Sequence, residues 1–227
     1  NHAGRAANPA LVAAEQIVSA SDIHCPANQA TPHPMSGVEI ADAVAAFGAA
    51  ARRVREAGFD AIEIPFSHGY LIHQFLSPYT NRREDEYGGT LENRLRFGKE
   101  VIAAVRREVG SGFPIVVRLN AHDYVEGGLT IRDAIEIARV LETLDVTAIS
   151  VTSGTMCESI AYCLYPTGTP KANLIPMAMQ IRAASRLPVI VAGRIRTPAA
   201  ARDVLEAGQV DLIGLGRPLL ADPDWVR

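Results

Sequence analysis

The chain has 227 residues, of which 48% are hydrophobic and 21% charged, and its mean hydropathy is +0.09. This composition is typical of an ordinary folded domain, and the length suits one α/β barrel. A net charge of −3 and an isoelectric point near 6.1 give no electrostatic case for nucleic acid or an anionic membrane as partner, and no apolar run approaches the length that spans a bilayer.

The cysteines show no cross-linking or metal-binding pattern. Cys25, Cys157 and Cys163 are an odd number with no C-x-x-C spacing, so we expect neither a disulfide framework nor a zinc site. Residues 1–5 have neither a basic head nor an apolar core, and we do not expect them to be a signal peptide. Together these features predict a protein of the reducing cytoplasm.

The first part of the chain begins with an irregular segment. Residues 6–35 are rich in Pro, Ser, Asn and Ala and show little periodicity, which indicates an excursion without regular structure. Ser36 and Glu39 then form a capping-box pattern, which predicts a helix that ends at Gly58. A short apolar run at residues 61–64 predicts a buried strand.

The rest of the chain alternates between helix and strand patterns. Apolar runs predict four further strands, at residues 114–119, 148–151, 189–192 and 211–214. Helical periodicity and caps predict helices at residues 91–109, from Thr130, at residues 174–185, and from Thr197 with proline at its first position. Residues 152–171 are rich in Gly, Ser, Thr and Pro and are expected to form a long loop.

Five strands that alternate with helices, each an unbroken apolar run, indicate a parallel sheet buried on both faces. Periodicity alone leaves open both a doubly wound sheet and a barrel. The barrel is favoured because polar side chains stand at or just past the C-terminal ends of the strands, which form the active-site face of a (β/α) barrel. These residues are His68, Arg118, Thr152, Arg194 and Arg217. We therefore expect α/β architecture in a single TIM-barrel domain.

Arg118 interrupts a strand that is otherwise apolar. A buried guanidinium needs a partner, because breaking a buried ion pair costs about 3–5 kcal/mol. Two kinds of partner remain open at this point. One is a carboxylate of a neighbouring strand, and the other is an anionic ligand.

Two Gly-Arg pairs follow the last two predicted strands: Gly193 with Arg194, and Gly216 with Arg217. Glycine lets backbone N–H groups approach a phosphate, and arginine adds a charge-assisted hydrogen bond. Barrels commonly hold a phosphate in the loops after their last two strands. The pairs predict a phosphate site, and the alternative is turn-forming glycines with arginines in solvent.

His68 and Tyr70 follow the first predicted strand and are the candidate catalytic residues. A phenol keeps its proton at neutral pH and can donate it to the carbon next to an activating carbonyl. An imidazole N–H can hold the carbonyl oxygen and stabilise the developing enolate. The alternative is that both side chains only pack the loop.

The other polar residues nearby are expected to be structural. His73, His122 and Asp123 lack metal-ligand spacing, and we expect them to be loop residues. Charges of alternating sign around a Gly-Gly turn predict an ion-pair network that fixes a loop. Its members are Arg82, Arg83, Asp85, Glu92 and Arg94.

Residues 60–97 carry a composite motif that resembles the old yellow enzyme family of flavin-dependent ene-reductases. The motif consists of His68-Gly69-Tyr70, Gln74-Phe75-Leu76-Ser77-Pro78, Asn81-Arg82-Arg83, Asp85, Tyr87-Gly88-Gly89 and Glu92-Asn93-Arg94. Residues 188–194 and 214–223 look like the family's FMN-phosphate loops, and residues 2–5 resemble the end of its third barrel strand. One position departs from the pattern, since the family's first histidine is Pro65 here.

The resemblance implies an incomplete (β/α)8 barrel of about six units that binds FMN, with NAD(P)H as reductant. It makes His68 the substrate anchor and Tyr70 the proton donor, and it places Arg118 against the pyrimidine edge of FMN. It assigns the FMN phosphate to Gly193, Arg194, Gly216 and Arg217. The family's early strands also contact the flavin and are missing here, so we expect residues 1–227 alone to bind FMN weakly.

The substrate that the resemblance implies is a small molecule with an activated C=C bond, of the enoate, enone or dienoyl type. Pro65 removes one of the two usual anchors. Residues 150–155 and 165–171 look closer to longer relatives similar to 2,4-dienoyl-CoA reductase and trimethylamine dehydrogenase, which add an iron–sulfur cluster and a second flavin domain downstream. Amine dehydrogenation is therefore one alternative, and a non-catalytic fragment without flavin is another. A homo-oligomer is left open.

Overall fold

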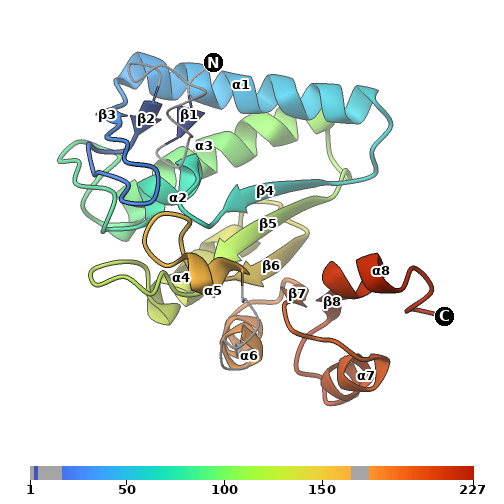
Figure 1. Ribbon diagram of the computed structural model, residues 1–227. Helices are drawn as coiled ribbons and strands as arrows, with labels where there is room; N and C mark the ends of the chain where they lie inside the picture. Colours follow the sequence, from blue (N-terminus) through green and yellow to red (C-terminus); the bar gives the residue numbers. More distant parts are fainter. Residues whose placement is uncertain (1–2, 5–16, 165–173) are drawn as a thin grey trace.

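The computed structural model describes residues 3–4, 17–164 and 174–227. Its centre is a five-stranded parallel sheet in which every strand pairs with the next one along the chain, as in a barrel wall (Figure 1). The strands are β4 (Ile62–Phe66), β5 (Ile115–Asn120), β6 (Ala148–Thr152), β7 (Val189–Ala192) and β8 (Leu212–Gly214). All five predicted strands are confirmed, with ends shifted by two residues at most.

The two faces of this sheet differ in burial. Residues in register across a parallel sheet lie on one face, and the next residue of each strand lies on the other. The row Ile64, Val117, Ile149 and Val189 belongs to the hydrophobic core and is at most 2% exposed. The neighbouring row lies on the opposite face and consists of Pro65, Arg118, Ser150, Ile190 and Leu212. Functional side chains of the strands are therefore to be sought on this second face.

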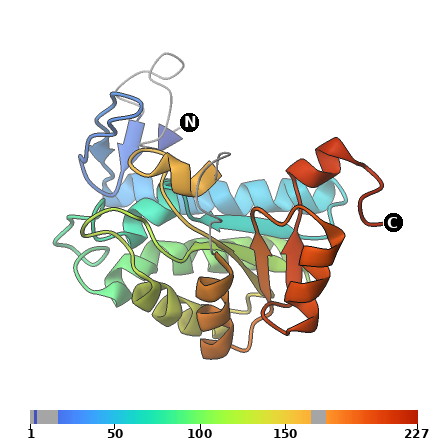
Figure 2. The ribbon, with the colours of Figure 1, turned by 60° about the horizontal axis from the view of Figure 1, so that its bottom comes forward.

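Long helices cover the core face. Helices α1 (Gly37–Glu56) and α3 (Leu91–Val109) run side by side along the sheet (Figures 1 and 2). They approach closely at Gly48, where an added Cβ would lie 3.4 Å from the carbonyl oxygen of Ala104. The remaining helices are α2 (Leu71–Leu76), α4 (Ile131–Glu142), α5 (Ile160–Leu164), α6 (Leu174–Ala184), α7 (Pro198–Glu206) and α8 (Arg217–Ala221).

The predicted N-terminal caps at Ser36 and Thr197 are confirmed, whereas α1 ends at Glu56, with Ala57 and not Gly58 as its C-cap. The Ser36 hydroxyl accepts a hydrogen bond from the Glu39 N–H at 3.3 Å, and the Ser36 N–H donates to the Glu39 carboxylate at 2.8 Å. Thr197 caps α7 by accepting from the backbone N–H of Ala200 at 3.2 Å. Such caps satisfy backbone donors that the first helical turn leaves free.

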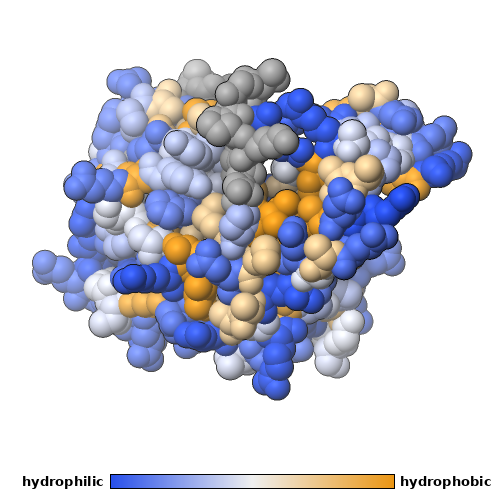
Figure 3. Space-filling model, turned by 90° about the horizontal axis from the view of Figure 1, so that it is seen from below, coloured by the Kyte–Doolittle hydropathy of each residue, from blue (hydrophilic) through white to orange (hydrophobic). Residues whose placement is uncertain are grey.

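The lower face of the molecule in Figure 1 is mostly hydrophilic. Helices α6 and α7 are the lowest elements in that view. Seen from that side, hydrophilic side chains cover most of the surface, with hydrophobic ones gathered near the middle (Figure 3). Within residues 17–164 and 174–227, no helix combines the length and apolar character needed to cross a membrane.

The irregular segment expected at residues 6–35 contains strands that the sequence did not reveal. A second parallel sheet is formed by β1 (Ala3–Gly4), β2 (Ile17–Ser19) and β3 (His33–Pro34), in the order β1-β2-β3. Strands of two or three residues are too short for an alternation pattern to show in the sequence. Of residues 2–5, only Ala3 and Gly4 are described, and they pair with β2. The third-strand role expected for residues 2–5 stays a prediction.

The expectation that no cysteines pair is wrong. Cys25 and Cys157 form a disulfide that joins the segment between β2 and β3 to the loop after β6. An odd number of cysteines leaves room for one pair and one free thiol, and Cys163 is the free thiol. The two bonded residues are 132 positions apart, so no local spacing could signal the bond. The cysteine count therefore no longer supports a reducing compartment.

Candidate active site

The candidate site begins where β4 ends. Ser67, His68 and Gly69 turn the chain from β4 into α2, and all three are buried. His68 has a φ of +60° and Gly69 a φ of +79°, so two consecutive residues adopt the left-handed conformation. This conformation is unfavourable for a residue with a side chain and persists where the surroundings enforce it.

The His68 imidazole is contacted at both ring nitrogens. Nε2 lies 3.1 Å from the Thr152 hydroxyl, and Nδ1 lies 3.2 Å from the Cys163 sulfur. Burial lowers the pKa of His68 to about 4, and the Arg118 charge acts in the same direction. Burial raises the pKa of Cys163 to about 12, so this side chain is a thiol. His68 is therefore a neutral imidazole at neutral pH, with one N–H to offer.

Tyr70 presents its side chain at the surface beside His68. It occupies the N-cap position of α2 and is 45% exposed. The two rings meet edge to face, with their centroids 6.4 Å apart. The structure thus brings His68, Tyr70 and Thr152 together, as expected of a site past the C-terminal ends of the strands.

Arg118 lies inside β5 and not at its end, which corrects its predicted position. Its guanidinium is 3.6 Å from the Glu63 carboxylate, with both side chains more than a third exposed. The strand neighbour that was one of the two expected partners is therefore present. The Nε atom of Arg118 is nevertheless buried and has no hydrogen-bond partner within the described ranges. A buried donor of this kind suits a polar ligand on the open face of the sheet.

The two Gly-Arg pairs stand at the ends of adjacent strands. Ala192 and Gly214 are in register, so the pairs that follow them share one edge of the sheet. Gly193 and Arg194 have φ values of +126° and +56°, and a Cβ added to Gly216 would meet no atom within 4 Å. An open turn beside a left-handed arginine is the kind of backbone that admits a phosphate.

The predicted charge network is only partly an ion-pair network. Arg83 pairs with Asp85 and also donates to the carbonyl oxygens of Ala20 and Met35, at 3.1 and 2.7 Å. Arg94 donates to the carbonyl oxygen of Leu76 at 2.7 Å. Both arginines thus tie backbone segments together, which agrees with a structural role.

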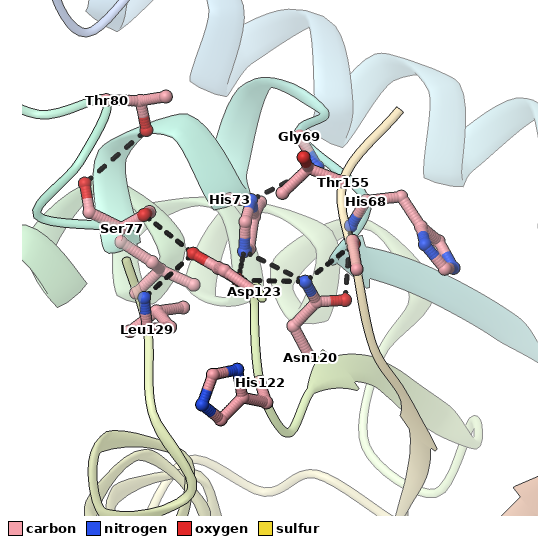
Figure 4. A network of polar contacts seen from close by, with 12 residues as sticks. His68, Gly69, His73, Ser77, Thr80, Asn120, His122, Asp123, Leu129 and Thr155 are labelled. Atoms are coloured by element: carbon pink, nitrogen blue, oxygen red, sulfur yellow. Dashed lines mark hydrogen bonds and ion pairs between the residues drawn. The ribbon is translucent and has the colours of Figure 1, made fainter. Parts of the chain in front are cut away.

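The sequence missed a buried network centred on Asp123 (Figure 4). Its carboxylate accepts hydrogen bonds from four groups: His73 Nε2 at 2.8 Å, Ser77 Oγ at 2.7 Å, Asn120 Nδ2 at 3.0 Å and Leu129 N at 2.8 Å. The reading of His73 as a loop residue is therefore corrected, since His73 lies in α2, whereas Asp123 lies in the loop after β5 as predicted. Both side chains are 1% exposed. A carboxylate directly after a buried strand was the available signal.

A group of aromatic rings borders the site. Tyr124 and Tyr162 stack with their ring centroids 3.8 Å apart. The ring centroids of His122 and Tyr124 are 4.6 Å apart. Tyr162 precedes Cys163 on α5, the short helix that brings the thiol to His68. The loop after β6 therefore forms one side of the site, and the disulfide at Cys157 holds this loop.

A wall of parallel strands with polar side chains and an open turn at Gly216 near its C-terminal edge is the architecture of a (β/α)-barrel protein. The sequence matches the NADH:flavin oxidoreductase / NADH oxidase family over residues 1–227, and the chain belongs to this family. Members of the family bind FMN and use NAD(P)H as reductant. The family prediction is confirmed.

Individual relatives agree with this assignment. The chain is 41% identical to an NADPH dehydrogenase of Listeria welshimeri over 226 residues, which cover 100% of the chain and 63% of the relative. Among solved structures, a 2-naphthoyl-CoA reductase complex superposes with a TM-score of 0.85 at 33% identity, over 91% of the chain and 31% of that protein. An old yellow enzyme homologue of Zymomonas mobilis superposes with a TM-score of 0.79 at 26% identity. The match covers 98% of this chain and 63% of that protein.

These superpositions confirm the predicted fold as a part of the old yellow enzyme barrel. The chain spans only part of its curated relatives, 35% of one and 33% of another. The activity of the whole protein is therefore a matter of inference from the site.

Proposed function

We propose that the chain forms the FMN-binding and substrate-binding part of an NAD(P)H-dependent oxidoreductase that reduces a C=C bond conjugated to a carbonyl group. The observation that carries the proposal is the pairing of a neutral, buried His68 with a surface phenol, Tyr70, at the end of β4. A hydrogen-bond donor for an oxygen next to a proton donor for a carbon is the arrangement that such a reduction needs.

The residues present fit FMN. The turns at Gly193–Arg194 and Gly216–Arg217 would hold the phosphate, since they lie at one edge of the sheet and Gly216 faces open space. Arg118 Nε, which is buried and has no hydrogen-bond partner among the described residues, would donate to a polar edge of the ring system. When bound, FMN supplies the redox centre that takes a hydride from NAD(P)H and delivers it to the substrate.

The protein's own side chains would bind the substrate carbonyl oxygen and supply the proton. The His68 N–H would hold the substrate carbonyl oxygen, taking the place of its present contact with Thr152 or Cys163. The Tyr70 hydroxyl would donate a proton to the carbon that becomes negative. Pro65 has no donor to add, so His68 would be the main anchor, and the substrate would gain affinity from contacts elsewhere.

Flavin content and two half-reactions test this function. The full-length protein that contains this chain should purify with, or take up, FMN and show visible absorbance. In the absence of oxygen, NAD(P)H should bleach this absorbance and 2-cyclohexenone should restore it. Failure to bind added FMN would overturn the proposal. Bleaching by trimethylamine, with no response to NAD(P)H, would favour amine dehydrogenation, the candidate that the missing donor at Pro65 supports.

The phosphate contact can be tested by itself. In the full-length protein, Arg217→Ala should weaken FMN binding by about 1.5–3 kcal/mol, the contribution of a hydrogen bond to a charged group. Titration of the apo-protein with FMN measures the loss. Riboflavin, which lacks the phosphate, should bind the parent and Arg217→Ala equally. Arg202 is exposed on α7, and Arg202→Ala serves as the control for loss of an arginine. Equal FMN affinity in Arg217→Ala and the parent would place the phosphate elsewhere.

A further inference from the structure

We propose that Asn120, Asp123 and His73 act as a clamp that holds the backbone of His68 and Gly69 in its left-handed conformation, and thereby positions the two candidate catalytic side chains. The three residues, called the Asn120–Asp123–His73 clamp below, are positioning residues, because they bind the backbone and not the substrate. The inference rests on the proposed function for its effect on catalysis, but its structural part can be tested separately.

The clamp is built on a fully charged carboxylate. Burial acts to raise the pKa of Asp123, but the hydrogen bonds that its carboxylate accepts from His73, Asn120 and Leu129 act in the opposite direction, and the pKa is lowered to about 2. All four groups that contact the carboxylate at 2.7–3.0 Å are donors. A carboxylate is an acceptor at both oxygens, so it fixes the orientation of every donor around it.

Asp123 fixes the tautomer of His73. His73 Nε2 lies 2.8 Å from the carboxylate and must carry the hydrogen that it donates. His73 Nδ1 lies 3.1 Å from the backbone nitrogen of Gly69 and accepts its N–H. A neutral imidazole has one donor and one acceptor, and both are used here.

Asp123 also fixes the orientation of Asn120. The amide nitrogen of Asn120 donates to Asp123 at 3.0 Å and to the carbonyl oxygen of Gly154 at 2.9 Å. Its oxygen is then the atom that faces His68, and it accepts the His68 backbone N–H at 3.3 Å. The backbone N–H groups of His68 and Gly69 therefore donate to two side chains, Asn120 and His73, that the Asp123 carboxylate orients (Figure 4).

The left-handed conformation of His68 needs support from the surrounding structure. A left-handed conformation is unfavourable for a residue with a side chain and persists when its surroundings over-determine it. The carbonyl of His68 is bound as well, because it accepts the Met156 N–H at 3.0 Å. Tyr70 follows Gly69 directly, so a change of φ at Gly69 moves the phenol relative to the imidazole, and a change of φ at His68 moves both side chains relative to β4.

The same groups do not form a nucleophilic triad. In such a triad the serine hydroxyl contacts the imidazole, which the carboxylate orients from its other side. Here Ser77 donates to Asp123 Oδ2, and the second imidazole nitrogen is used by Gly69. The network is therefore suited to holding the backbone.

A pair of matched asparagine variants tests the clamp in the FMN-loaded full-length protein. Asn81 is the control, because it is also buried, accepts one backbone N–H, from Arg83, and donates to two carbonyl oxygens, of Phe75 and Tyr87. It does not contact the clamp residues in these hydrogen bonds. Asn120→Ala and Asn81→Ala should therefore lower the melting temperature to a similar extent.

Only Asn120→Ala should loosen the segment 67–70. We expect hydrogen exchange of this segment to rise about tenfold or more, the effect of losing about 1.4 kcal/mol of local protection. The alkene half-reaction should slow by up to about 100-fold, the loss that a displacement of about 1 Å can cause in a catalytic group. Equal exchange and equal rates in the two variants would overturn the clamp.

A second pair keeps the test decisive if Asn120→Ala does not fold. His73→Gln retains one donor and one acceptor, and His73→Leu retains neither. Protection of segment 67–70 should be kept at least partly in the glutamine variant and lost in the leucine variant. The same exchange in both would overturn the clamp. The exchange result holds whether or not the protein reduces alkenes, so failure of the proposed function and failure of the clamp can be told apart.

Discussion

Replacing Tyr70 with phenylalanine should slow reduction of the alkene by about 10²–10⁴-fold, the usual contribution of a general acid. The variant keeps the ring and its edge-to-face contact with His68 and removes only the hydroxyl. Oxidation of NAD(P)H should proceed at its normal rate, because hydride transfer from the nicotinamide requires no proton from Tyr70. Stopped-flow absorbance, with the two half-reactions followed separately, measures both rates.

A second tyrosine controls for loss of a hydroxyl as such. Tyr87 donates to the Glu100 carboxylate at 3.1 Å and takes no part in the contacts of His68. Tyr87→Phe should therefore leave the alkene half-reaction unchanged. An unchanged alkene rate in Tyr70→Phe would show that the proton has another source, with water or His68 next in line.

Elements specified by local chemistry were predicted well. The helix at residues 91–109 matches α3 at both ends, the capping box at Ser36 forms as expected, and α4 follows Thr130 as predicted. A cap depends on residues three positions apart, so the sequence displays it directly. The five buried strands were also predicted, because their apolar runs are long enough to show.

Features that depend on distant pairing were not predictable in this way. His73 and Asp123 are 50 residues apart. The residues next to them in the sequence do not indicate that α2 brings the His73 imidazole to the Asp123 carboxylate in the loop after β5. Strands β2 and β3 are three and two residues long, and their pairing partners lie outside any local pattern. Tertiary packing decides such contacts, and single-sequence patterns carry no information on it.

Arg118 shows an intermediate case. The apolar run predicted that its strand is buried, which holds for Val117 and Leu119 but not for the residue between them. Alternation places Arg118 on the face opposite the core, where it reaches Glu63 on β4. The sequence indicated a charged group in the sheet, and only the register shows its partner.

The disulfide gives the other large expected effect. It links residues 132 positions apart, and a cross-link that closes a long loop stabilises a protein by about 2–4 kcal/mol, chiefly by restricting the unfolded chain. Cys157→Ser should lower the free energy of unfolding by about this amount. Urea unfolding of the full-length protein, with and without a reductant, measures the change.

The reductant and the third cysteine make this test specific. Reductant should destabilise the parent and Cys163→Ser, which both keep the bond between Cys25 and Cys157, and should have no effect on Cys157→Ser. A parent protein that unfolds at the same urea concentration with and without reductant contradicts the bond. The disulfide also holds the loop whose Met156 N–H binds the His68 carbonyl, at 3.0 Å. Reduction should therefore raise hydrogen exchange at residues 153–159 at urea concentrations below those that unfold the protein. Once the bond is broken, this loop can open locally without moving the segment around Cys25.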